Sequence, residues 1–212
     1  MTQRKKNTAR RSSGKKCTVL VTGFEPFDGA TSNPSEDVAR LLHHAEVSGC
    51  RVNGGLLPCV FGAATRELFR LIAAHDPVLV ICVGLAGERI AVTPERAALN
   101  VVDARIPDNA GRQPVDEPVV RGGPAAYWST LPVKAIVAEI SGRGIPAKVS
   151  ESAGTFVCNH VFYGLMHRLR RRKRIRAGFI HIPPATNGSG TAVLSVERSA
   201  AAILTAIEVS LR

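Results

Sequence analysis

Short apolar runs that end near glycine or proline alternate with helical patterns along most of this chain, and this alternation restricts the possible folds most strongly. Three runs are continuous stretches rich in valine, isoleucine and leucine: residues 17–24, 78–87 and 177–184. Strands of a parallel sheet have this composition because helices cover both of its faces. A further strand is expected over residues 145–152.

Helical patterns fill the intervals between the expected strands. They cover residues 33–45, 62–77, 125–144, 151–169 and 191–212. Asn33 or Ser35 is the expected N-cap of the first helix, and the second should stop before Pro77. The order predicts one α/β domain from residue 17 to residue 212. Its expected architecture is a three-layer α/β/α sandwich around a twisted, mixed but mostly parallel sheet, phosphorylase/hydrolase-like in kind.

The positive charge of the chain is concentrated in two tracts. Residues 1–16 carry seven basic and no acidic side chains, and residues 168–176 carry seven more basic ones, whereas the whole chain has a net charge of +11. The rest is therefore close to neutral. We expect residues 1–16 to be a disordered extension and the second tract to be a solvated helix end. Nucleic acid is then at most a weak, non-specific partner.

Cysteine usage and hydropathy bear on the compartment. The five cysteines are widely spaced, with neither a CxxC pair nor a zinc-like cluster, so reduced thiols and no metal or cofactor are expected. No apolar run approaches the ~20 residues that span a bilayer. We expect a cytoplasmic protein that does not contact membranes.

One cysteine stands where a nucleophile could act. Cys158 follows the turn-prone Ala153-Gly154 and opens the helical pattern that comes after an expected strand end. Ligands gather at the carboxyl ends of strands in α/β sheets. Unpaired N–H groups at a helix start lower the pKa of a thiol, so we expect Cys158 to have thiolate character.

A cysteine nucleophile needs a base within hydrogen-bond reach. His160 is two residues away on the same helix, so its side chain should diverge from Cys158. His181 lies near the carboxyl end of an apolar strand and is the best candidate. A third group should orient the imidazole. Glu95 and Asp103 both follow a strand end, and the pattern does not choose between them.

Five blocks together resemble the pyroglutamyl peptidase I family, the pyrrolidone-carboxylate peptidases. They are TVLVTGFEPFDGATSNPS, VGLAGERIAVTPERAALNVVDARIPDNAG, RGGPAAYWSTLPVKAIV, ESAGTFVCNHVFYGLMH and GFIHIP, in order from residue 17 onward. The resemblance implies a cysteine peptidase that removes an N-terminal pyroglutamyl residue from peptides. It also implies a homo-oligomer, a dimer or tetramer.

The resemblance places the family triad on Glu95, Cys158 and His181, and so favours Glu95 over Asp103. It implies a substrate pocket with matching residues from several segments: Phe24, Phe27, Asn33, Arg105, Ile106, Phe156 and Val157. Arg105 would contribute electrostatically near the site. The chain departs from the family after His181, where the loop over residues 184–190 has an unusual sequence.

Two other functions remain as alternatives. One is a basic α/β protein that binds nucleic acid. The other is an enzyme like the nucleoside phosphorylases, which have a related architecture but would leave Cys158 without a role.

Overall fold

Parallel strands form the centre of the structure, a computed structural model that describes residues 17–185 and 193–212. The main sheet has six strands in the order β2-β3-β1-β4-β8-β5. β3, β1, β4 and β8 run parallel, while β2 and β5 pair antiparallel at the two edges. Their bounds are β1 Thr18–Phe24, β2 Glu46–Val47, β3 Cys50–Leu57, β4 Leu79–Leu85, β5 Thr93–Pro94 and β8 Arg176–Ile182.

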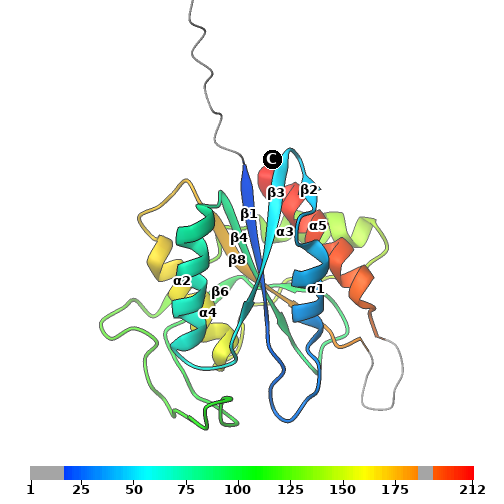
Figure 1. Cartoon of the computed structure of the whole chain (residues 1–212). Helices are drawn as coiled ribbons and strands as arrows, with labels where there is room; N and C mark the ends of the chain where they lie inside the picture. The colour runs from blue at the N-terminus through cyan, green and yellow to red at the C-terminus, as the bar shows by residue number, and fades with distance from the viewer. Residues whose placement is uncertain (1–16, 186–192) are drawn as a thin grey trace, which may run out of the picture.

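Helices cover both faces of this sheet (Figure 1). On one side, α1 (Pro34–Leu42) and α3 (Val133–Gly142) both contact α5 (Val196–Leu211). On the other side, α2 (Ala63–His75) packs against α4 (Val157–Leu169). Each layer closes its own hydrophobic core against the sheet. The expected three-layer α/β fold with a mixed, mostly parallel sheet is confirmed.

The three apolar runs form β1, β4 and β8, and nearly all of their residues are buried. β3 was not predicted, because its sequence contains Gly54 and Gly55 instead of branched residues. Gly54 is required by packing: a Cβ there would lie 2.1 Å from the carbonyl oxygen of Ala39 in α1. The glycine that hides this strand in the sequence thus allows a helix to approach it.

Two expected elements were wrong. Residues 125–144 do not form one helix, because Ala126–Trp128 is a strand, β7, which pairs with β6 (Ala97–Leu99) in a small second sheet. Pro132 is the N-cap of α3, where its missing N–H group is tolerated. Residues 145–152 form isolated bridges, Val92 to Ala147 and Glu95 to Ser150, in place of the expected strand.

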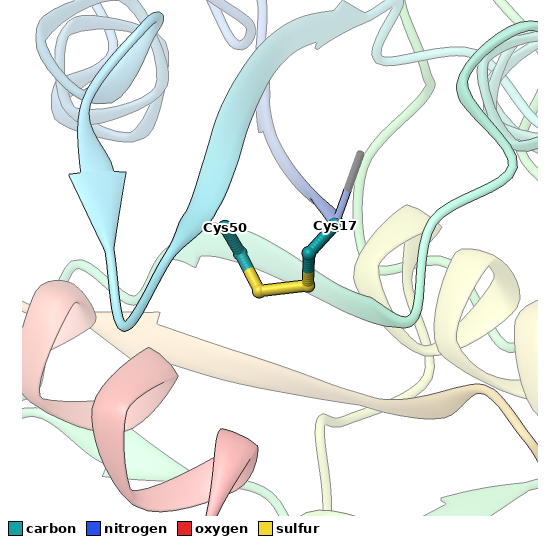
Figure 2. Close-up of a disulfide and its surroundings, with 2 residues drawn as sticks. All are labelled: Cys17 and Cys50. Atoms are coloured by element: carbon teal, nitrogen blue, oxygen red, sulfur yellow. A yellow bond between two sulfur atoms is a disulfide. The ribbon is translucent and has the colours of Figure 1, made fainter. Parts of the chain in front are cut away.

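The expectation that all cysteines are reduced was also wrong. Cys17 and Cys50 form a disulfide at the amino ends of β1 and β3 (Figure 2). The register pairs Thr18 with Arg51, so the two preceding cysteines lie side by side, with their Cα atoms 4.4 Å apart. The remaining cysteines, Cys59, Cys82 and Cys158, are free thiols.

The second basic tract, residues 168–176, lies at the amino end of β8, the opposite end of this strand from His181. α4 ends at Leu169 and β8 begins at Arg176, so the tract forms the exposed turn at the amino end of β8. Residues 1–16, expected to be a disordered extension, lie outside the described residues. So does most of the 184–190 loop, whose sequence differs from that of the family. Within the described part of the chain, no helix is long and apolar enough to cross a membrane.

Candidate active site

The carboxyl ends of the central strands bring the candidate residues together. Phe24 ends β1, Gly84 lies near the end of β4, and His181 lies near the end of β8. Gly84 and His181 are register partners in adjacent parallel strands, so the space above Gly84 lies next to the imidazole. Cys158, at the second position of α4, reaches this space from the next layer.

Glu95 and His181 form a buried pair. Nδ1 of His181 lies 2.7 Å from Oε1 of Glu95, and the two side chains are 5% and 0% exposed. The backbone N–H of Glu95 also donates to the carbonyl of Phe179 on β8, at 2.9 Å. A carboxylate only accepts hydrogen bonds, so Nδ1 carries the hydrogen and Nε2 is left able to accept a proton.

Asp103, the alternative partner, has an exposed side chain. Its backbone pairs with Thr155 in the segment before α4: the Asp103 N–H donates to the Thr155 carbonyl at 3.1 Å, and the Thr155 hydroxyl donates back at 2.7 Å. The carboxylate that contacts His181 is therefore that of Glu95.

Gly84 leaves room for the sulfur of Cys158. A Cβ at Gly84 would lie 3.0 Å from Sγ of Cys158 and 2.8 Å from the ring of Phe179. Cβ atoms of register partners point to the same face of a sheet. The sulfur therefore occupies the face of β4 that corresponds to the imidazole of His181 on β8. Sequence analysis did not identify Gly84, although its position in an otherwise branched, apolar strand was a signal of close approach.

The pKa of Cys158 does not follow the prediction from its helix position. Burial raises the pKa of the thiol above its usual range, and the neighbouring Cys59 and Glu95 reinforce the shift. Burial lowers the pKa of His181, although its hydrogen bond to Glu95 acts in the opposite direction. Both shifts favour the uncharged form of the group concerned.

The start of α4 offers backbone donors beside the sulfur. Its N-cap, Phe156, has extended backbone and makes no side-chain capping bond. Gly154 has φ of +79°, which lets the chain turn sharply into the helix. The first N–H groups of a helix have no intrahelical acceptor. They are thus available to an anionic oxygen bound near Cys158.

Aromatic side chains cluster around Phe156, the residue before α4. The rings of Phe27 and Phe156 are 6.2 Å apart, and Phe61 meets Phe156 edge-on at 5.4 Å. Phe24 and Val157 are almost fully buried, which places them in the packing behind this surface. Phe61 was missed by sequence analysis, because its place beside Phe156 depends on the packing of α2 against α4.

Asn33 has a structural position. It is the N-cap of α1, where its Oδ1 accepts hydrogen bonds from the N–H and hydroxyl of Ser35 at 3.1 and 2.9 Å. Its Nδ2 donates to the carbonyl of Glu25 at 3.1 Å. Asn33 therefore holds the turn that carries Phe24 and Phe27, and its contacts within the protein explain its burial.

Arg105 and Ile106 lie in the segment between β6 and β7. The side chain of Arg105 is exposed, and that of Ile106 is half-buried. Asp108 fixes the segment, accepting hydrogen bonds from the backbone N–H groups of Phe61, Ala110 and Arg112, each at 2.9 Å. This anchoring ties the segment to the start of α2.

His160 turns away from Cys158, as predicted. Its Nε2 accepts from the N–H of Gly62 at 3.3 Å, and its ring lies edge-on to Phe61. Burial lowers its pKa to about 4. Among residues 17–185 and 193–212, no cluster of three potential metal-ligating side chains occurs.

Comparison with known proteins places the chain among peptidases. The model of the pyroglutamyl peptidase family matches residues 17–212. The chain belongs to the pyroglutamyl peptidase family. The pyrrolidone-carboxylate peptidase of Chromobacterium violaceum is 56% identical to it over 92% of both chains. That of Klebsiella pneumoniae is 54% identical over the same shares.

Solved structures agree with this membership. Pyroglutamyl peptidase I of Bacillus amyloliquefaciens superposes with a TM-score of 0.87 at 46% identity, over 92% of this chain and 96% of that one. Pyrrolidone carboxyl peptidase of Thermococcus litoralis gives 0.86 at 40% identity, over 92% and 93%. This pyroglutamyl peptidase family member is therefore a hydrolase that acts on peptides, and its resemblance to the family is confirmed.

Proposed function

We propose that the protein removes the N-terminal pyroglutamyl residue from peptides, with Cys158 as nucleophile, His181 as general base and acid, and Glu95 as the group that orients the imidazole. The observation that carries this proposal is the buried Glu95–His181 hydrogen bond, set beside a glycine that admits the Cys158 sulfur. The names of the relatives support the same substrate class.

The first half of the reaction forms a thioester. Nε2 of His181 takes the thiol proton as Sγ of Cys158 attacks the pyroglutamyl carbonyl carbon. The oxygen of the tetrahedral intermediate becomes negative and accepts hydrogen bonds from backbone N–H groups at the start of α4. When the carbon–nitrogen bond breaks, the imidazolium returns its proton to the departing amine.

The second half releases pyroglutamate. His181 takes a proton from water, whose oxygen attacks the thioester carbon, and the proton is then returned to the Cys158 sulfur. Glu95 keeps Nδ1 protonated and stabilises the transient imidazolium in both halves.

The pocket suits an uncharged ring. A pyrrolidone ring is flat and neutral, and the rings of Phe27 and Phe156, 6.2 Å apart, provide apolar faces for it. Ile106 is a further apolar side chain of the proposed pocket. An open-chain glutamyl group would bring both an ammonium and a carboxylate into this surface, and their desolvation would oppose binding. Arg105, exposed in the same segment as Ile106, contributes positive potential at the entrance.

Release of a fluorophore from pyroglutamyl, prolyl and glutamyl amides tests the proposal. We expect turnover of the pyroglutamyl amide alone, abolished in Cys158→Ala and retained in Cys82→Ala, which removes another buried thiol of the same core. Equal turnover of the prolyl amide would refute the substrate class. Retained activity in Cys158→Ala would refute the nucleophile.

A further inference from the structure

Arg89 joins the segments that carry the three proposed catalytic groups. Its Nη1 donates to Oε1 of Glu95 at 2.6 Å and to the hydroxyl of Thr93. Its Nη2 donates to the carbonyl of Ser152 at 3.3 Å. Ser152 lies in the loop that leads to Cys158, while Thr93 pairs with His181 across β5 and β8. One guanidinium thus spans all three segments.

Arg89 is the charged partner of the Glu95 carboxylate. Glu95 is fully buried, and Arg89, itself 25% exposed, is the cation that pairs with it. Both Arg89 and His181 use Oε1, while Oε2 has no hydrogen-bond partner among the described residues. Buried carboxylates are rare unless they are paired. The Arg89 guanidinium therefore supplies the buried carboxylate with its cation and holds the same oxygen that faces the imidazole.

We propose that Arg89 is a positioning residue for hydrolysis, one that fixes the Glu95 carboxylate against His181 and holds the loop before Cys158 in register with it. The inference rests on the proposed function of the triad. Sequence analysis did not single out Arg89, although a buried carboxylate in its segment called for a cation nearby.

The positive charge of Arg89 also acts on the base. The charged groups facing His181 are the carboxylate of Glu95, which raises the pKa of the imidazole, and Arg89, which lowers it. The thiol of Cys158, above Gly84 on the same face of the sheet, is the other titratable group on this side. An imidazole accepts a proton only when it is neutral. Removing the Arg89 charge should therefore raise the pKa of His181 and move the acid limb of kcat/KM to higher pH.

Three variants test this role. Arg89→Met removes the charge and the hydrogen bonds but keeps an unbranched side chain. Arg89→Lys keeps the charge and loses the planar fork. Arg96→Gln is the matched control, because Arg96 follows Glu95 directly but pairs outward with the exposed Glu151 at 3.2 Å. The measurements are kcat and KM for a pyroglutamyl amide across pH, together with thermal unfolding.

For Arg89→Met, we expect kcat to fall about 10- to 100-fold, the range found when a hydrogen-bonded partner that orients a metal ligand is removed, with KM nearly unchanged. Its acid limb should move to higher pH. Arg89→Lys should lose less kcat and keep the wild-type limb, and Arg96→Gln should match the wild type. If Arg89→Met is unstable, Arg89→Lys still tests the proposal. If Arg89 were purely structural, the folded lysine variant would have the same kcat as the wild type, whereas a positioning role predicts a lower kcat.

Two outcomes would overturn the inference while leaving the proposed function intact. One is wild-type kcat in both Arg89 variants alongside an active parent enzyme. The other is a loss of kcat that follows thermal stability alone, with no movement of the acid limb in Arg89→Met. An inactive parent enzyme would instead reject the proposed function itself.

Discussion

A methyl group added at Gly84 would push into the reacting sulfur. In Gly84→Ala, the new Cβ would lie 3.0 Å from Sγ of Cys158 and 2.8 Å from the ring of Phe179. Favourable contacts between such atoms are about 3.5–4.0 Å. The sulfur or the ring must therefore move by about 0.5–1 Å, since β4 is central in the sheet and cannot withdraw.

Such a displacement has two measurable consequences. A misplacement of this size in a reacting group lowers kcat/KM by about 100-fold. Overpacking of a core costs about 1–3 kcal/mol of unfolding free energy. Both are measured on one preparation, by initial rates with a fluorogenic pyroglutamyl amide and by urea unfolding, with rates taken where the variant is fully folded.

Gly142→Ala is the control, because a Cβ there, at the end of α3, would meet nothing within 4 Å. This variant should keep wild-type rates and lose no stability. Wild-type kcat/KM in folded Gly84→Ala would refute the placement of the sulfur over β4.

The disulfide and the base give two further predictions. Replacing Cys17 and Cys50 with serine opens a link between residues separated by 33 positions, and the loop-entropy relation gives a loss of about 3.7 kcal/mol in unfolding free energy. Urea unfolding should show this loss while kcat is unchanged, and equal stability would contradict it. For the wild type, burial lowers the pKa of His181 below its ordinary 6.5, so kcat/KM, which needs the neutral imidazole, should remain high down to a pH below 6.5; an acid limb centred above 6.5 would contradict the lowered pKa.

The fold was predictable where one segment carries its own signal. β1, β4 and β8 are runs of branched apolar residues, and α2 has a clear periodicity that ends before Pro77. β3 could not be predicted from its own sequence, because Gly54 is needed only to let α1 pack closely against this strand. The disulfide escaped prediction for a similar reason, since strand register alone brings Cys17 to Cys50.

The candidate site shows the same division. Position at a strand end or helix start was enough to select Cys158 and His181, whose neighbourhood the structure then defines. The contacts of Arg89 and the upward shift of the Cys158 pKa could not be predicted from position in the sequence. Both depend on how other segments pack around the site, and burial is the largest cause of the raised pKa of the Cys158 thiol.

The identity of the nucleophile is tested most directly by alkylation. Iodoacetamide is added in limiting amounts, residual activity on a pyroglutamyl amide is measured, and labelled peptides are quantified by mass spectrometry for the free thiols Cys59, Cys82 and Cys158. We predict that activity falls in proportion to label on Cys158 and reaches zero at one label per chain. 2-Pyrrolidone, which carries the ring proposed to occupy the pocket, should slow both the labelling of Cys158 and the loss of activity. Full labelling of Cys158 with activity retained, or loss of activity that follows label on Cys59 or Cys82, would contradict the account.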